Sequence, residues 1–479
     1  MLLEDRPAAV RVPHAPSRAA RARAFPRPGL HASIVLGALA LAALSLLLPS
    51  TPTYDPWAWI IWGREIAHLD LSTVEGPSWK PLPVFFTTIF SVFGDASPDL
   101  WLVIARAGAF AALAYAFLVA RRLGGGVAGG VAAAAGLAIA PWWIRNGGMG
   151  NSEGLIIAFV LAAVERHLAG DRRAAFLLGA CAALLRPEAW PFLGLYGLWL
   201  LWRRHLHPAL VLGTGAAVLA LWILPEWWGS GDAWRAAHRA KDVNPGAPTY
   251  AENPALAVLE DAGEMLTTAM LLGLAAIAVR AALVRDRAVV WLMALAVAWL
   301  GLVVYMTSDG FSGNQRYLMT PVALGIVLGA AGAGWVVTAV ARRAGPAGIA
   351  VAAVALGAAF AVPSLARLEP TLHSLEYQAK LNDAVGPLVR EAGGRDALLR
   401  CGTPYTGPFL VPVLAWHLRL HTSQVNLNPR APAVVFRERT TSGSRPVPTV
   451  RGIEGVPQEN LATRDPMWRV IGACEAGAA

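Results

Sequence analysis

Long apolar runs separated by short loops recur along most of this chain, and this pattern constrains its fold more than any other feature. About eleven runs approach the twenty residues or so that a helix needs to cross a bilayer, once tilt and breaks are allowed for. Lipid admits only helices and closed barrels, because backbone polar groups find no water there. We therefore predict an all-α polytopic membrane protein. The runs lie at about residues 31–48, 100–120, 127–144, 152–168, 174–186, 189–202, 209–225, 264–284, 288–307, 318–341 and 347–363.

Composition supports a membrane protein and argues against a nucleic-acid partner. Hydrophobic residues make up 56% of the chain and charged residues only 15%, against about 25% charged in a soluble domain. The formal net charge is +9, and nucleic-acid binding would need those cations gathered on a soluble face. Most of them lie instead in the N-terminal tail or in short loops. We expect no nucleic acid among the partners.

The signs of the loop charges predict the topology. Alternate loops are basic, which is the positive-inside pattern, and the loops between them hold more acids. We predict a multi-pass plasma-membrane protein with a disordered, basic, cytoplasmic tail at 1–31. A transmembrane domain at 32–363 follows, with a first external loop at 50–99. The basic loops carry Arg121, Arg122, Arg166, Arg172, Arg173, Arg203, Arg204, Arg280, Arg285, Arg287, Arg342 and Arg343.

Residues 364–479 have ordinary polar content, many Pro and Gly, and no spanning run. Short stretches at 397–401, 433–436 and 468–473 are typical of strands, and 375–391 is typical of a helix. Since the last apolar run is expected to end outside, we predict a small extracytoplasmic α/β domain.

Two of the three cysteines, Cys401 and Cys474, lie in this C-terminal region, whereas Cys181 lies inside an apolar run. Their spacing matches no metal site. An extracytoplasmic location allows a disulfide between Cys401 and Cys474, with free thiols as the alternative.

The stretch from Tyr54 to Leu82 combines charged ends with an aromatic centre. Asp55 stands at its start and Lys80 at its end. Between them an amphipathic run, Trp57 to Ile66, is predicted to lie in the bilayer interface. A carboxylate and an ammonium that bracket such a helix would hold a reaction at the membrane surface.

Each charged end has two interpretations. Asp55 could act as a general base toward a hydroxyl, or it could cap the helix that Pro56 introduces. Lys80 lies between prolines and beside Trp79, and could bind a phosphate as a point charge. Its alternative is ordinary snorkelling to the interface.

Polar residues that are unusual for a membrane protein fall almost entirely on the predicted outer side. Polar groups at membrane depth need a partner or a task, and one-sided clustering indicates a single cavity that opens outward. A transporter would be expected to spread such groups toward both faces. The set consists of Asp55, Lys80, Arg106, Arg145, Asn146, Asn151, Glu153, Arg186, Glu188, Asp309, Asn314, Arg316 and Tyr317.

Structural alternatives exist for several members of this set. Arg186 could bind a phosphate through its planar fork or form an ion pair with Glu188. Glu153 stands at a predicted helix start, where the helix dipole favours a carboxylate. Arg316 stands at another helix start, where a cation is disfavoured, so it needs an anion. That anion could be a lipid phosphate or Asp309.

Four short motifs, in this order, resemble the GT-C superfamily of membrane glycosyltransferases. Tyr54-Asp55-Pro56 stands where the family has its acidic motif. Trp79-Lys80-Pro81-Leu82 is similar to the Lys-Pro element of the protein O-mannosyltransferase and lipid A aminoarabinose transferase branch. The segment 93–106, which ends in Arg106, resembles the segment that follows the Lys-Pro element in that branch of the family. Asn314 to Leu318 resembles the Arg-Tyr element before a late helix. The likeness covers roughly residues 32–330.

The resemblance implies a polyprenyl-phosphate sugar donor and glycosyl transfer on the outer leaflet with inversion at the anomeric carbon. Asp55 would deprotonate the acceptor hydroxyl, and Lys80 with Arg106 or Arg316 would hold the departing phosphate. The acceptor would be a glycan, a glycolipid or a protein. A transporter or flippase of lipid-linked sugars is the alternative function.

Further residues are expected to line the substrate site. Pro56 follows Asp55 where many family members have a second acid, so we assign no metal ligand, and a divalent metal stays an open alternative. The lipid tail is expected beside the interfacial tryptophans. The substrate-binding set is Tyr54, Trp79, Glu153, Arg186, Glu188, Asn314 and Tyr317.

Overall fold

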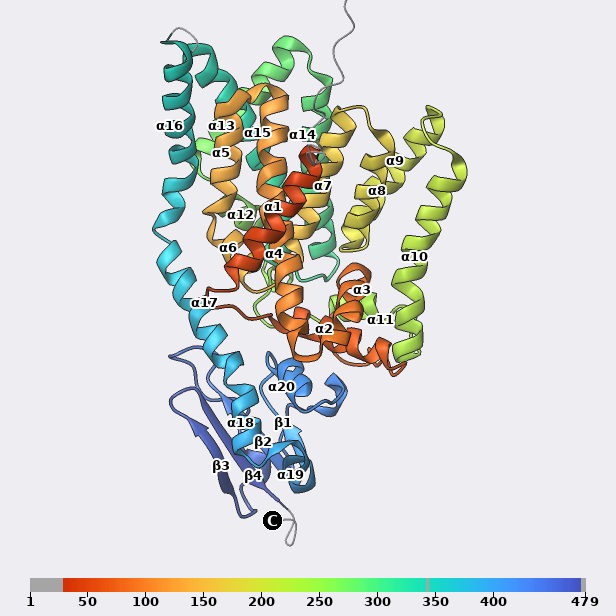
Figure 1. Cartoon of the computed structure of the whole chain (residues 1–479), viewed down its shortest axis with the longest axis vertical. Coiled ribbons are helices and arrows are strands. Elements are labelled where there is room, and N and C mark those ends of the chain that lie inside the picture. Colours follow the sequence, from red (N-terminus) through yellow and green to blue (C-terminus); the bar gives the residue numbers. More distant parts are fainter. Residues whose placement is uncertain (1–28, 342–343, 475–479) are drawn as a thin grey trace, which may run out of the picture.

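The computed structural model describes residues 29–341 and 344–474. Most of the tail predicted at 1–31 therefore lies outside the described residues, as do Arg342 and Arg343. A bundle of helices forms the larger part, and a small α/β part extends from one end of it (Figure 1). The bundle contains α1 (Leu30–Ser45), α4 (Ser97–Ala120), α5 (Gly126–Ala138), α6 (Pro141–Gly148), α7 (Glu153–Leu168), α8 (Arg172–Ala183), α9 (Trp190–Trp202), α10 (Pro208–Ser230), α12 (Pro254–Glu264), α13 (Thr268–Val284), α14 (Arg287–Ser308), α15 (Gln315–Ala341) and α16 (Gly345–Leu365).

Most predicted runs are helices, but one of them is broken and another begins late. The run predicted at 127–144 ends as α5 and restarts as α6 at Pro141, because the residue before a proline is disfavoured in helical geometry. The run predicted at 264–284 begins only at Thr268, after a bend of 99° from α12. Another bend, of 112°, separates α6 from α7.

Among the described residues, 5 helices are long and apolar enough to cross a membrane, or up to 7 if each bent pair counts as one span. Several others, such as α8 with 12 residues and α9 with 13, are shorter than the roughly twenty residues that a full crossing takes. The protein is thus a multi-pass membrane protein, and the count of about eleven crossings stays a prediction.

Glycines bring α13 and α15 into close contact. A Cβ added at Gly273 would lie 2.1 Å from the carbonyl oxygen of Gly329, and one at Gly332 would lie 2.1 Å from that of Gly273. Small residues at such positions let helix backbones approach each other, as is common in membrane bundles. This contact fixes α15, which carries Arg316 in its first turn.

The segment 50–99, predicted to be the first external loop, folds into α2 (Tyr54–Ala67), α3 (Pro81–Phe90) and η1 (Ser91–Ala96). These elements lie across the end of the bundle that faces the C-terminal part (Figure 1). The aromatic run predicted to lie in the bilayer interface is packed inside the protein, where Trp59 and Trp62 are fully buried. Trp59 packs edge-on against Trp101 of α4, and Trp62 packs against Trp79.

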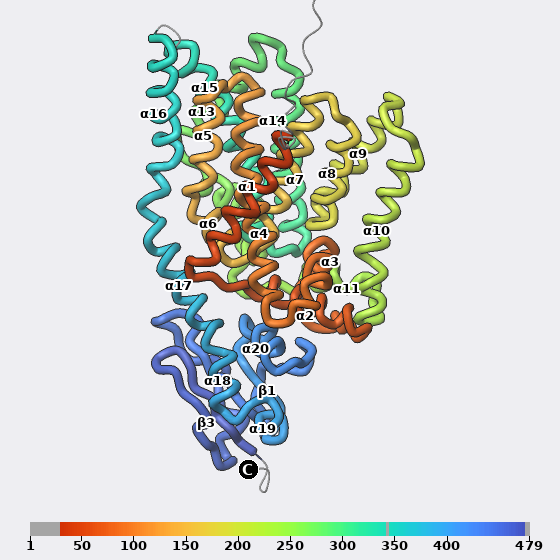
Figure 2. Tube along the Cα trace, viewed as in Figure 1, coloured from red at the N-terminus to blue at the C-terminus, as the bar shows by residue number. Residues whose placement is uncertain are grey.

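The chain passes from α16 through α17 into the C-terminal part (Figure 2). Its sheet has the order β1-β2-β4-β3, with β1 parallel to β2 and the other pairs antiparallel. The elements are α17 (Leu368–Asp383), α18 (Val385–Glu391), α19 (Gly394–Cys401), β1 (Thr403–Tyr405), α20 (Val411–His417), β2 (Ala433–Glu438), β3 (Glu459–Arg464) and β4 (Trp468–Ala473).

Sequence reasoning located this part well, with one error. Strands at 433–436 and 468–473 are confirmed as β2 and β4, and the helix predicted at 375–391 forms as α17 and α18. The strand predicted at 397–401 is wrong, since those residues end α19. Leu398 and Cys401 are its buried residues, at the i, i+3 spacing of one helix face.

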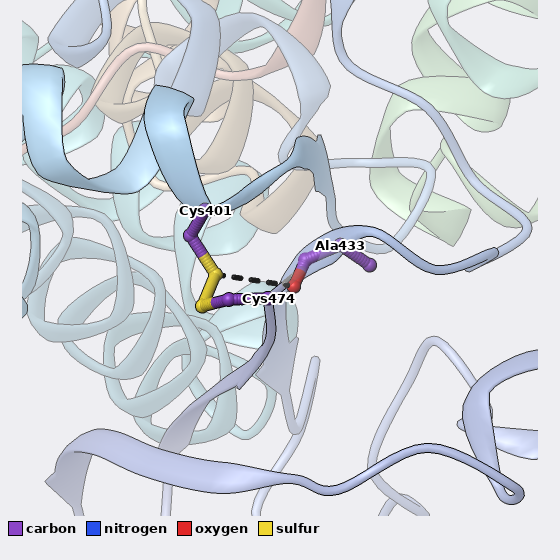
Figure 3. The surroundings of a disulfide bond; sticks show 3 residues. All are labelled: Cys401, Ala433 and Cys474. Carbon is purple, nitrogen blue, oxygen red and sulfur yellow. Dashed lines mark hydrogen bonds between the residues drawn. A yellow bond between two sulfur atoms is a disulfide. The ribbon is translucent and has the colours of Figure 1, made fainter. Parts of the chain in front are cut away.

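A disulfide joins Cys401 at the end of α19 to Cys474 just after β4 (Figure 3). Cys401 Sγ lies 3.8 Å from the carbonyl oxygen of Ala433 in β2. The bridge thus ties a helix to the middle of the sheet. Cys181 remains a free cysteine.

Short 3₁₀-helical turns and one π-helical turn connect these elements. They are η2 (Arg121–Gly125), η3 (Pro187–Ala189), η4 (Pro248–Tyr250), η6 (Thr422–Gln424) and η7 (Arg451–Ile453), and one further short helix, α11 (Arg235–Lys241), follows α10.

Candidate active site

Asp55 and Arg316 form an ion pair between two segments that are far apart in sequence. Arg316 Nη1 lies 2.9 Å from Asp55 Oδ2, and their side chains are 30% and 16% exposed. The same nitrogen donates to Asn151 Oδ1 at 3.3 Å. The first turns of α2 and α15 therefore meet the α6–α7 bend at one place, and ligands can reach this pair.

The structural alternatives for both residues are wrong. The N-cap of α2 is Thr53, so Asp55 does not cap that helix. Asp309 forms an ion pair with Lys241 at 2.8 Å, whereas the anion that pairs with Arg316 is Asp55. Asn314 Oδ1 accepts a hydrogen bond from the Arg316 backbone N–H at 3.2 Å, which orients the start of α15.

Lys80 is the N-cap residue of α3 and is only 8% exposed. Its Nζ donates to Ser152 Oγ at 3.0 Å and lies 4.9 Å from the centre of the Trp59 ring. Among the described residues, no carboxylate is within ion-pairing distance of Nζ. Burial, with help from the positive charge of Arg186, lowers the pKa of Lys80 to about 8. Lys80 is thus a buried ammonium without an acid, not a snorkelling side chain.

Glu226 of α10 holds the segment that leads to Lys80. Its carboxylate accepts hydrogen bonds from Trp79 N–H and Thr73 Oγ1, both at 3.2 Å, and pairs with Arg235 at 3.3 Å. Glu226 is fully buried. The sequence offers one signal for it, since a carboxylate beside an apolar run indicates a partner.

Arg186 forms a buried ionic wall beside the Asp55–Arg316 pair. It pairs with Glu153 and, at 3.2 Å, with Glu188, which supports the ion-pair alternative. Its guanidinium lies 4.5 Å above the ring of Tyr317. Three buried atoms here have no hydrogen-bond partner: Glu153 Oε2, Arg186 Nε and Glu188 Oε2. Such atoms are costly unless something else satisfies them, which a polar ligand would do.

The six charged side chains of this cluster balance one another. Three are acids and three are cations, and Arg316 is the cation that pairs with the accessible carboxylate of Asp55. A phosphate would therefore need Lys80, which has no acid of its own, and it would compete with Asp55 for Arg316. The members are Asp55, Glu153, Glu188, Lys80, Arg186 and Arg316.

Two predicted site residues, Arg106 and Trp79, lie away from the cluster, whereas Tyr54 stays beside it. Arg106 donates to the Ser45 carbonyl at 3.0 Å and to the Gly148 carbonyl at 2.8 Å, so it ties α1 to α6 and makes no bond to the cluster. Trp79 is 2% exposed and packs against Trp62. Tyr54 adjoins Asp55 in α2, and burial raises the pKa of its phenol.

An apolar cavity of about 790 Å³ lies on the other side of Arg106. It is lined by residues of α1, α4, α6 and α17, among them Phe110, Trp143 and Leu375. α6 also carries Asn146, whose Oδ1 accepts from Asn151 at 3.0 Å. One short helix thus adjoins both the cavity and the ionic cluster.

No group of three or more His, Cys, Asp or Glu in the described residues is placed to hold a metal ion.

The apolar helices define a multi-pass membrane protein, and its fold resembles that of two solved structures. A crystal structure of ArnT from Cupriavidus metallidurans bound to undecaprenyl phosphate matches with a TM-score of 0.57 and 16% identity, over 93% of this chain and 98% of that one. A crystal structure of the same protein in the apo state matches with a TM-score of 0.56 and 16% identity, over 92% of this chain and 97% of that one. No protein-family model and no curated protein matches the sequence. The likeness concerns the fold.

Proposed function

We propose that this protein is a membrane glycosyltransferase that moves a sugar from a polyprenyl-phosphate donor to an acceptor hydroxyl at the outer leaflet. The observation that carries the proposal is the Asp55–Arg316 pair, which is accessible and lies beside an ammonium without an acid. A base and two cations at one place are what phosphate departure and hydroxyl attack need. The ArnT-like fold supports this function, since one of those structures contains undecaprenyl phosphate.

Donor binding would switch on the base. The donor phosphate binds Lys80 and takes Arg316 from Asp55, so the carboxylate loses its cation and becomes a better proton acceptor. Asp55 then takes the proton of the acceptor hydroxyl, and the oxygen of that hydroxyl attacks the anomeric carbon of the donor sugar. The bond from that carbon to the phosphate oxygen breaks, the configuration inverts, and the polyprenyl phosphate leaves with its charge held by Lys80 and Arg316.

The buried ion-pair group of Arg186, Glu153 and Glu188 would supply polar contacts to the donor sugar. Glu153 and Glu188 each keep one carboxylate oxygen without a hydrogen-bond partner, and these oxygens can accept from hydroxyls of the donor sugar. We place the polyprenyl tail in the apolar cavity of about 790 Å³ beside α6. Arg106 then stabilises the α1–α6 contact at the mouth of that cavity rather than binding the phosphate.

The topology completes the proposal. The ends of α2 and α15 that carry the site lie at the end of the bundle that faces the C-terminal part (Figure 1). We propose that this end is extracytoplasmic, that the arginine-rich connections at the other end face the cytoplasm, and that the bundle makes about eleven crossings. The acceptor is a glycan, a glycolipid or a protein.

The Asp55→Asn variant tests the proposal. We expect membranes with this variant to form no transfer product from polyprenyl-phosphate pentoses or hexoses, while binding of undecaprenyl phosphate persists because Lys80 and Arg316 remain. Arg451→Ala, an exposed change in the C-terminal part, is the matched control and should retain transfer. Transfer by Asp55→Asn at the wild-type rate would overturn the catalytic assignment. Movement of lipid-linked sugar across the bilayer without any transfer product would instead indicate a transporter.

A further inference from the structure

The bend between α6 and α7 contacts each of the three cations in the ionic cluster. Its φ of 69° places Gly150 in the left-handed region that favours glycine, and an added Cβ there would lie 2.9 Å from Leu102 Cδ2. The three residues that follow Gly150 each bind a different cation. The contacts are Asn151 with Arg316 at 3.3 Å, Ser152 with Lys80 at 3.0 Å, and Glu153 with Arg186.

Asn151 differs from the other two because its cation also pairs with the proposed base. Arg316 Nη1 donates to Asp55 Oδ2 at 2.9 Å and to Asn151 Oδ1 at 3.3 Å. A guanidinium has five N–H donors, and two of them are on Nη1. In the part of the chain that the structure describes, Nη2 and Nε of Arg316 make no hydrogen bond. These nitrogens can therefore bind a phosphate while Nη1 stays with Asn151.

The amide of Asn151 is fixed in one orientation. Its Nδ2 donates to Asn146 Oδ1 at 3.0 Å, and Asn146 Nδ2 donates to the Trp142 carbonyl at 2.7 Å. The two donors to Asn151 Oδ1 are Arg316 and the Thr53 hydroxyl, the latter at 3.0 Å. Asn151 is only 6% exposed, and a rotated amide would bury a donor against these donors. The oxygen thus faces Arg316 whether or not a ligand is bound.

The same oxygen also contacts the segment that carries the base. Thr53 is the N-cap residue of α2 and stands two positions before Asp55. Its backbone N–H donates to the Met149 carbonyl at 3.0 Å, which is a second bond to the bend. Asn151 Oδ1 is therefore a fixed point between the start of α2 and the guanidinium on α15.

A fixed acceptor matters because Arg316 has to change partners in the proposed reaction. When the donor phosphate takes Arg316 from Asp55, Nη1 loses one of its two acceptors. The bond to Asn151 remains, so the side chain loses less conformational freedom as it binds the phosphate. Without that bond, the phosphate alone would have to order the guanidinium.

We propose that Asn151 is a positioning residue of the glycosyl transfer, which holds Arg316 Nη1 while that arginine passes from Asp55 to the donor phosphate. Asn151 touches none of the reacting atoms and acts through Arg316. This inference rests on the proposed function, because it assigns how one of the phosphate-binding cations is held.

A double-mutant cycle on phosphate binding tests the role. The probe is undecaprenyl phosphate, titrated onto the full chain in nanodiscs. Asn151→Ala should weaken binding roughly three- to tenfold, which is the cost of ordering one long side chain. The same substitution in an Arg316→Ala background should have no further effect, because no guanidinium is left to hold.

Two further variants make the cycle interpretable. Asn382→Ala removes another amide that is 6% exposed, in α17, and should leave the affinity unchanged even if it lowers the thermal stability. Asn151→Leu keeps the volume of the side chain and replaces Asn151→Ala if that variant does not fold. It should give the same weakening and the same dependence on Arg316.

Two results would overturn the positioning role alone. They are equal affinity in Asn151→Ala and wild type, or an equal loss with and without Arg316, which a residue that only braces the bend would give. If the wild type binds no undecaprenyl phosphate, the proposed donor site falls together with this role. Failure of the inference can therefore be told from failure of the proposed function.

Discussion

Lys80 and Asp55 differ in their partners when no ligand is bound. Asp55 has a cation, whereas Lys80 has a hydroxyl and an aromatic ring but no carboxylate. Burial disfavours an ammonium, and this cost keeps the pKa of Lys80 near 8. A bound phosphate would offset the cost of burying this ammonium, so we expect Lys80 to contribute a large share of the free energy of donor binding.

The pH dependence of donor binding tests the state of Lys80. Since only the ammonium attracts a phosphate, affinity for undecaprenyl phosphate should fall above about pH 8, by up to tenfold per unit. Lys80→Arg should bind with little dependence up to pH 10, because a guanidinium stays charged. Lys80→Ala should bind weakly at every pH. An affinity that does not change between pH 7 and 10 in the wild type would exclude Lys80 from the phosphate site.

Glu226 should act on Lys80 through the backbone. Glu226→Gln removes the charge that Arg235 pairs with and weakens the bond to Trp79 N–H, so we expect several-fold weaker donor binding. Asp232→Asn, at an exposed carboxylate that is also near α11, is the control. A variant with normal donor affinity but lower thermal stability would show that Glu226 has a purely structural role.

At the scale of elements, apolar length predicted helices well and their breaks poorly. The α14 and α15 helices follow directly from their runs, whereas the bends at α6–α7 and α12–α13 depend on tertiary contacts that a run of apolar letters does not encode. An apolar run as short as residues 397–401 looks alike in a strand and in a helix, so its pattern does not distinguish the predicted strand from the helix that forms. Sequence alone also could not show that α3, α4 and α20 cover the tryptophans of α2.

The α13–α15 contact gives a prediction for helix packing. Gly273→Ala would put a Cβ against the Gly329 carbonyl, so the helices must separate and we expect a loss of roughly 1–3 kcal/mol, seen as a lower midpoint of thermal unfolding. Gly263→Ala, in α12, has open space around it and should be neutral or slightly stabilising. Equal midpoints for the two variants would mean that the helices do not approach this closely.

The C-terminal sheet contains a buried acid with its own pH signature. Glu438 in β2 is fully buried, and burial raises the pKa of its carboxyl to about 7. The folded state therefore holds a proton that the unfolded chain loses near pH 4.5. Stability of this part should be greatest below about pH 4.5 and should decline as the pH rises to about 7, by about 3 kcal/mol. Glu438→Gln should remove this contribution, which hydrogen exchange across β2 would measure; an unchanged pH profile would contradict it.

For the whole molecule, the sequence supplied the residues of the site but not its geometry. The charge pattern and motif order pointed to Asp55, Lys80 and Arg316, and the structure brings them together from α2, α3 and α15. The same reasoning placed Arg106 with them, yet this arginine serves α1 and α6 instead. Contacts such as Glu226 with Trp79 span 147 positions, and no local pattern specifies a partner at that separation.

The most direct test is a structure of this protein with undecaprenyl phosphate bound. We expect the phosphate to contact Lys80 Nζ and the Arg316 guanidinium, the Asp55–Arg316 pair of 2.9 Å to open, and the tail to enter the cavity beside α6. A phosphate bound elsewhere, with that pair intact and Lys80 still bonded to Ser152, would contradict the proposed function.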